Sequence, residues 1–63
     1  MAKTDIVVKL VGNDGNGMAI IARVRRALVD GGHHELAKTF VNEAMDGDYD
    51  HLLRTCMDYV EVE

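Results

Sequence analysis

All six glycines of this chain fall in three short breaks, at residues 12–17, 31–32 and 46–48. Glycine, asparagine and aspartate provide the positive φ angles and local hydrogen bonds that turns need. The breaks cut a chain of 63 residues into four short segments, and no run of about 18 apolar residues remains that could span a membrane. The sequence therefore predicts one small domain of short elements, without a linker or internal repeat.

The first segment, residues 3–11, has the alternating pattern of a β-strand. Val7 and Val11 make its second face half apolar, so we expect that face to be partly covered. The side chains predicted to face the core are Ile6, Val8 and Leu10.

The other three segments carry apolar residues at helical spacing. They predict helices over residues 18–30, from 33 or 34 to about 45, and from a cap at Asp48 or Asp50 to about Tyr59. The predicted apolar stripes are Ile20, Ile21, Val24, Ala27 and Leu28 in the first, Leu36, Phe40 and Ala44 with Ala37, Val41 and Met45 in the second, and Leu52, Leu53, Cys56, Met57 and Val60 in the third.

The ends of these helices have recognisable signals. Asn16 is a predicted N-cap, while residues 31–32 and Gly47 are predicted to end helices as C-cap glycines. Phe40 is the single Phe of a chain without Trp, and we expect it to be the largest side chain of the core.

The last residues, 59–63, alternate again, with Val60 and Val62 on one side. The predicted order is β-α-α-α-β, a small α+β domain with three short helices packed on a minimal two-stranded sheet. The pattern leaves the direction of strand pairing open. Two strands are marginal in water, so we expect a free edge to pair across a two-fold axis in a homodimer.

Cys56 is the single cysteine, so no disulfide can form within the chain, and cytoplasmic localisation is favoured. The beginning of the sequence lacks a signal-peptide pattern. A domain this small often needs a staple such as a disulfide, a metal or a second copy. Self-association is therefore the staple that we expect.

The formal charge of −4 disfavours nucleic-acid binding, in which Lys and Arg displace counterions from phosphates. It would suit a protein that binds basic surfaces. Arg23, Arg25 and Arg26 are the densest positive charge, and nucleic-acid binding through this arginine face stays an alternative. A solvated face that pairs with Asp30 or Asp14 is the interpretation we favour.

The loop at 12–17 lies between a strand and a helix start, where backbone N–H groups can hold an anion or nucleotide. It lacks the Lys and Ser/Thr of a P-loop, and Asp14 would repel a phosphate. A tight Asx-rich turn is therefore favoured. The residues of the alternative anion site are Gly15, Asn16, Gly17, Arg23 and Arg26.

Asp46, Asp48 and Asp50 have the spacing of a calcium loop, but His51 and Met57 stand where Gly and Glu are needed. Helix capping explains these aspartates better.

His33, His34, His51 and Cys56 have neither metal-ligand spacing nor the arrangement of a Cys–His nucleophile. We therefore expect no metal, no cofactor and no enzymatic activity.

Tyr49 and His51 flank a capped helix start, and with Arg25 they are candidate partner-binding residues. Tyr49 could equally be a hydrophobic staple that packs on Leu53, and we favour the staple because Tyr49 lies beside the predicted cap.

Five segments of the chain have a familiar sequence: 8–12 (VKLVG), 14–16 (DGN), 23–28 (RVRRAL), 47–53 (GDYDHLL) and 60–63 (VEVE). In these segments the chain resembles short, single-domain proteins of unknown function from bacteria and their phages. It departs from them at residues 17–18, where such proteins have a small residue followed by an aromatic one, and at Tyr59, where they have Trp. The resemblance implies an uncharacterised protein associated with mobile elements and transfers no site residues.

These patterns favour a non-enzymatic binding or regulatory module that works as a small homo-oligomer with a protein partner.

Overall fold

The computed structural model describes residues 2–10 and 17–63. Its elements follow the predicted order, so the small β-α-α-α-β fold of the α+β class is confirmed. The helices begin and end within one residue of the positions that the sequence predicts. The elements are β1 (Val7–Val8), α1 (Gly17–Asp30), α2 (His34–Ala44), α3 (Tyr49–Tyr59) and β2 (Glu61–Val62).

The two strands form a parallel sheet, in which Val7 is paired with Glu61 and Val8 with Val62. Regular pairing is shorter than the strand predicted over 3–11. The residues before and after β1 nevertheless also bond to the last residues of the chain. Lys3 N–H donates to Asp58 O at 2.8 Å, and Leu10 N–H donates to Glu63 O at 3.0 Å. Val11 lies outside the described residues.

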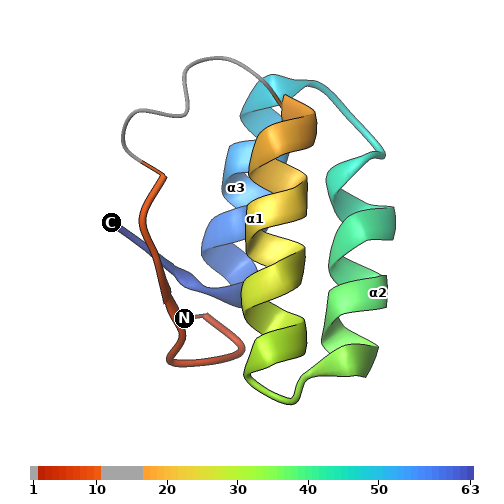
Figure 1. Ribbon diagram of the computed structural model, residues 1–63. Helices are drawn as coiled ribbons and strands as arrows, with labels where there is room; N and C mark the ends of the chain where they lie inside the picture. The colour runs from red at the N-terminus through yellow and green to blue at the C-terminus, as the bar shows by residue number, and fades with distance from the viewer. Residues whose placement is uncertain (1, 11–16) are drawn as a thin grey trace.

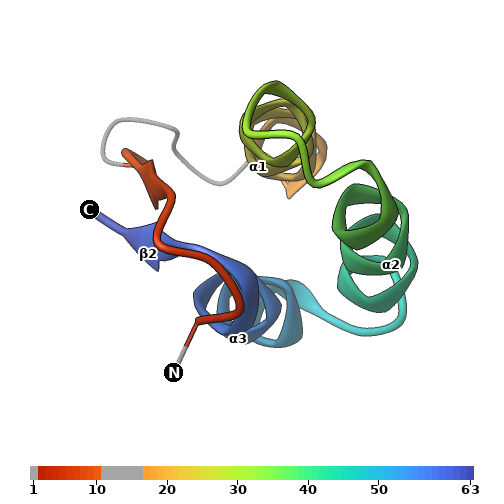
Figure 2. The same cartoon turned by 90° about the horizontal axis from the view of Figure 1, so that it is seen from below.

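The sheet packs against α1 and α3, and α2 lies on the far side of these two helices (Figures 1 and 2). The first and last segments of the chain thus lie side by side although three helices separate them in sequence. Burial follows the predicted alternation in β1, where Val8 is 4% exposed and Val7 is 53% exposed.

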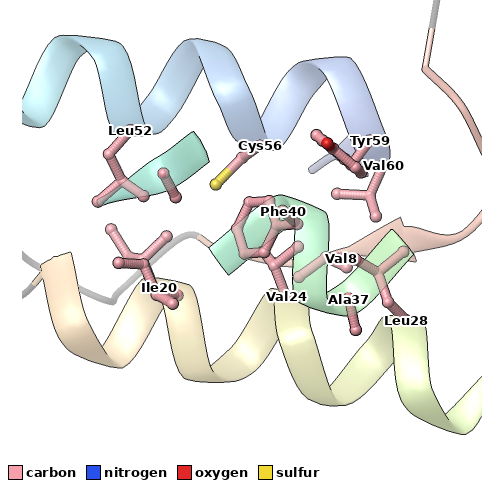
Figure 3. Close-up of a cluster of buried hydrophobic side chains, with 12 residues drawn as sticks. Val8, Ile20, Val24, Leu28, Ala37, Phe40, Leu52, Cys56, Tyr59 and Val60 are labelled. Atoms are coloured by element: carbon pink, nitrogen blue, oxygen red, sulfur yellow. The ribbon is translucent and has the colours of Figure 1, made fainter. Parts of the chain in front are cut away.

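The core lies between the three helices, with Phe40 of α2 at its centre (Figure 3). Tyr59, and not Phe40, is the largest fully buried side chain, which corrects the prediction. The two rings pack edge to face with their centroids 5.4 Å apart, a favourable geometry for an aromatic pair. Tyr59 follows Leu52 by seven positions and Cys56 by three, so it continues the buried stripe of α3.

One prediction for α3 is wrong, because Met57 was expected in its apolar stripe but is 55% exposed. The buried stripe of α3 includes Thr55 instead, at 3% exposure. Thr55 can enter the core because its hydroxyl donates to the carbonyl of His51 at 2.8 Å, which leaves no buried polar atom unpaired. Val62 shares the face of Val60 but stays 41% exposed, because it lies at the edge of the sheet.

The glycines of the breaks have two different roles. Gly32 adopts a φ of +84° after α1, as predicted for a C-cap glycine. Gly47 does not adopt a positive φ, and Met45 is the C-cap of α2. A Cβ on Gly47 would lie 2.7 Å from the His51 ring, so this glycine is needed for close packing and not for a left-handed turn.

Candidate functional site

Each strand of the sheet has one edge that faces away from the other strand. Glu61 N–H donates to Ile6 O at 2.8 Å, and Glu63 N–H donates to Val8 O at 2.9 Å. In a parallel ladder, alternate residues of a strand bond to the partner strand, and the residues that come between them direct their N–H and C=O groups away from it. Across residues 2–10 and 17–63, no hydrogen bond engages the backbone of Val7 or Lys9. The outer edge of β1 can therefore accept another strand.

Apolar side chains accompany these edges. Val7, Met57 and Val62 are each more than 40% exposed, and all three line one open hollow beside β2. The acidic Asp5, Glu61 and Glu63 line the same hollow, together with Lys3. Large apolar side chains beside open strand edges are typical of surfaces that bind another chain.

The charged residues that flank β1 lie on the exposed face of the strand. Asp5 and Lys9 flank Val7 at two positions on either side, and both side chains are exposed. Among the described residues, the ion pair found is Arg26 with Asp30, at 3.7 Å on the surface of α1. Asp5 and Lys9 thus remain available to a partner strand.

The segment around Gly47 ties α2 to α3. The carboxylate of Asp48 accepts the N–H of His51 at 2.9 Å and caps α3, as the sequence predicts. The Nε2 of His51 lies 2.7 Å from Glu43 O. Because a carbonyl can only accept, Nε2 carries the proton and donates to one of the last carbonyl groups of α2. Asp48 and His51 therefore support the connection between the two helices.

Tyr59 extends this polar connection into the core. Its hydroxyl donates to the Glu43 carboxylate at 2.8 Å, and the Lys3 ammonium lies 4.4 Å from the centre of its ring. Thr4 also reaches this region, since its hydroxyl donates to Tyr59 O at 2.7 Å. Tyr59 thus joins α2, α3 and the segment that leads into β1.

Two buried groups that could act as nucleophiles, the Cys56 thiol and the Tyr59 hydroxyl, are kept neutral. Burial raises the pKa of the Cys56 thiol from 9.0 to about 11, although a backbone hydrogen bond opposes part of this change. Burial, the hydrogen bond to Glu43 and the negative charges of Glu43 and Asp58 raise the pKa of the Tyr59 hydroxyl to about 12. Near neutral pH both groups are protonated and closed to solvent, the opposite of an activated nucleophile.

The predicted anion site is only partly described, because Gly15 and Asn16 lie outside the described residues. Gly17 begins α1, and a Cβ there would lie 3.1 Å from Cδ2 of Leu52, so this glycine allows α1 and α3 to approach each other. Arg26 is nine residues further along α1, about 13 Å by helical rise. The structure therefore does not bring Gly17 and Arg26 together around one small anion.

The three arginines of α1 are divided between two surfaces. Arg23 and Arg26 lie with Ala22 and Asp30 along one side of the helix. Arg25 lies in a separate hollow between α1 and α2, with Lys38 and Asn42. The predicted arginine face is thus narrower than the sequence implies.

The remaining candidate partner residues lie near the start of α3. Tyr49 is 42% exposed, and Leu53 is half-buried against the core. His51 is exposed but already bonded to Glu43. Within residues 2–10 and 17–63, no group of three or more His, Cys, Asp or Glu side chains could hold a metal ion. No helix in the described ranges is long and apolar enough to cross a membrane.

The sequence pointed to Tyr49, His51 and Arg25 and predicted a free strand edge, but it did not identify which side of β1 is open. The signal was present in the alternation of Asp5, Val7 and Lys9, but its meaning depends on which side of the strand β2 occupies. Comparison of the chain with family models, curated proteins and solved structures finds no match.

Proposed function

We propose that this chain is a non-enzymatic binding module that acts through protein–protein contacts, as a small homo-oligomer with a protein partner. The observation that carries the proposal is a two-stranded sheet with open outer edges beside exposed Val7, Met57 and Val62. Isolated two-stranded sheets are marginal in water. A third strand or a partner surface would bury these side chains and satisfy the free backbone groups.

The chemistry of the interior supports binding over catalysis. Cys56 and Tyr59 are fully buried, and their raised pKa values keep both groups protonated at neutral pH. His51 uses its Nε2–H to bond the end of α2. These polar groups therefore stabilise the fold, and a general acid, base or nucleophile would have to come from elsewhere.

The hollow beside β2 also defines the chemistry of the partner. Its lining includes the apolar Met57 and Val62 and the acidic Glu61 and Glu63. A partner that presents apolar side chains next to Lys or Arg would match both properties. Its binding should weaken as salt concentration rises, because the two glutamates are exposed to solvent.

Site-specific photocrosslinking in cells tests the proposal. A photoreactive amino acid is placed at Met57 or at Val62, and at Lys38 on the far side of the molecule as a matched control. We expect the first two positions to give a discrete adduct of the same mass, which Glu61→Lys and Glu63→Lys together reduce. The control position should not give this adduct.

The mass of the adduct separates the two partners in the proposal, because a second copy doubles the mass of the chain and a different protein gives another value. Equal adduct patterns from all three positions, or no adduct from any, would contradict a binding role for this surface.

A further inference from the structure

We propose that two copies of this chain join through the outer edges of their β1 strands, antiparallel and in one register, to form a four-stranded sheet. This inference rests on the proposed function and names its first partner, a second copy. It depends on two features that occur together along β1 and its flanking residues. The backbone groups of the outer edge are free, and the side chains of Asp5, Val7 and Lys9 are exposed.

The backbone restricts the possible pairing. Val7 and Lys9 direct their N–H and C=O groups away from β2, since the acceptors on the β2 side are Ile6 and Val8. In an antiparallel pair, facing residues whose groups point inward exchange both hydrogen bonds. Odd-numbered residues must therefore face odd-numbered residues of the second copy.

Among the registers that place odd-numbered residues opposite each other, the charged side chains favour one. With Val7 opposite its own symmetry mate, Asp5 of one copy lies opposite Lys9 of the other, and the same pair recurs on the other side of the axis. A shift of two residues toward either end breaks this match. A shift of four residues puts Asp5 opposite the second copy's Asp5, or Lys9 opposite its Lys9. Opposite charges across a strand pair stabilise it, and like charges destabilise it. The order acidic, apolar, basic is thus self-complementary, as a two-fold interface requires.

The same register also matches the two faces of the strand. Val7 meets its mate on the outer face, where it is 53% exposed in one copy. Ile6 faces Val8 of the second copy on the inner face, so the two cores join along the new sheet. The charges of Asp5 and Lys9 have no ion-pair partner among the described residues, so pairing breaks no existing interaction.

The size of the interface sets its strength. Five paired residues span about 17 Å and form about six backbone hydrogen bonds, at the low end of the range for protein interfaces. Such a strip buries less than the roughly 800 Å² per partner of a stable complex. The dimer should therefore dissociate on dilution, and it does not use Met57 or Val62, which remain available to a different partner.

Charge-reversal variants test the register. Asp5→Lys and Lys9→Asp each replace both ion pairs by repulsive pairs, so each variant alone should dimerise at least tenfold more weakly than the wild type. An equimolar mixture of the two variants restores both attractive pairs between unlike chains. We expect sedimentation equilibrium from about 10 µM to 1 mM to show heterodimers in the mixture and monomers in each variant alone.

The controls carry the same changes of charge on α2, away from the sheet. Glu35→Lys and Lys38→Asp should dimerise like the wild type, and their mixture should dimerise no more strongly than either variant alone. Val7→Pro removes an N–H that β2 does not use, a change that an edge strand tolerates, and should also abolish dimers. Circular dichroism shows whether each variant is folded. If Val7→Pro does not fold, the test is decided by Asp5→Lys and Lys9→Asp.

A wild type that stays monomeric at 1 mM overturns the inference, and so does a mixture that associates no better than its two components. Dimers that persist in both single variants would place the contact elsewhere and overturn the register. If the inference fails while Met57 and Val62 still crosslink to another protein, the proposed function stands without it. Failure of both experiments would overturn the proposed function as well.

Discussion

At the scale of single residues, the His51 side chain leaves no room for a Cβ at position 47. Three carbons of the His51 side chain would lie 2.7 to 2.9 Å from a Cβ at position 47. The sequence identifies Gly47 as a turn residue, but it does not reveal the ring that lies against it. That contact depends on α3 folding back toward Glu43 at the end of α2.

Gly47→Ala should destabilise the fold by about 1–3 kcal/mol, because the ring must move and its hydrogen bond to Glu43 is lost. In a His51→Ala background the same change should cost much less, since the obstacle is gone. Urea denaturation of the four proteins in this double-mutant cycle measures the coupling. Equal costs in both backgrounds would show that the ring does not require the glycine.

Tyr59 connects the core to Glu43 through a buried hydroxyl. Tyr59→Phe keeps the ring that packs on Phe40 but removes this bond to a carboxylate, so we expect a loss of about 1–3 kcal/mol. Tyr49→Phe is the matched control, because Tyr49 is 42% exposed and should change stability by less than about 0.5 kcal/mol. Similar effects of the two substitutions would mean that the Glu43 bond adds nothing.

At the scale of elements, Asp48 separates two interpretations of the 46–50 segment. Asp48→Ala removes the acceptor for His51 N–H and should cost about 0.5–2 kcal/mol, while Asp48→Asn should retain most of the cap. Asp46→Ala should have little effect on thermal unfolding. If the two alanine variants are equally destabilised, capping is not the main role of Asp48. A calcium-induced rise in the melting temperature that both variants lose would instead favour an ion site.

The extent to which elements can be predicted follows from the range of the interactions that form them. The helices depend on local periodicity and caps, so Ile20, Val24 and Leu28 in α1 were assigned correctly to the core. The parallel direction of β1 and β2 depends on packing between segments more than fifty residues apart, which local patterns do not encode. Thr55 joins the buried stripe of α3 because a hydrogen bond to His51 satisfies its hydroxyl, and the apolar spacing did not indicate this.

The candidate site shows the same division. Exposed charge on Arg23, Arg25 and Arg26 was evident from the sequence, but α2 had to be placed to separate Arg25 from the other two. The open edge of β1 becomes visible only when β2 is known to occupy its other side.

At the scale of the whole molecule, a domain this small has one core, and both of its buried weak acids lie within it. Cys56 and Tyr59 have pKa values in the folded chain, about 11 and about 12, above their ordinary values of 9.0 and 10.0. The unfolded chain therefore releases these protons at lower pH than the folded chain does. Their contribution to stability is fully present below pH 9 and is lost as the pH rises toward 11 and 12.

Thermal unfolding measured under reducing conditions from pH 7 to 10.5 should show a melting temperature that falls progressively above pH 9. Cys56→Ala should start from a lower melting temperature because it leaves a small cavity, but its decline above pH 9 should be shallower. Tyr59→Phe should reduce the part of the decline that begins near pH 10, and Tyr49→Phe should not. A decline that is the same in the wild type and in Cys56→Ala would mean that the thiol is not the group that titrates. Both side chains belong to the core cluster of the described residues, so the alkaline loss of stability should follow them.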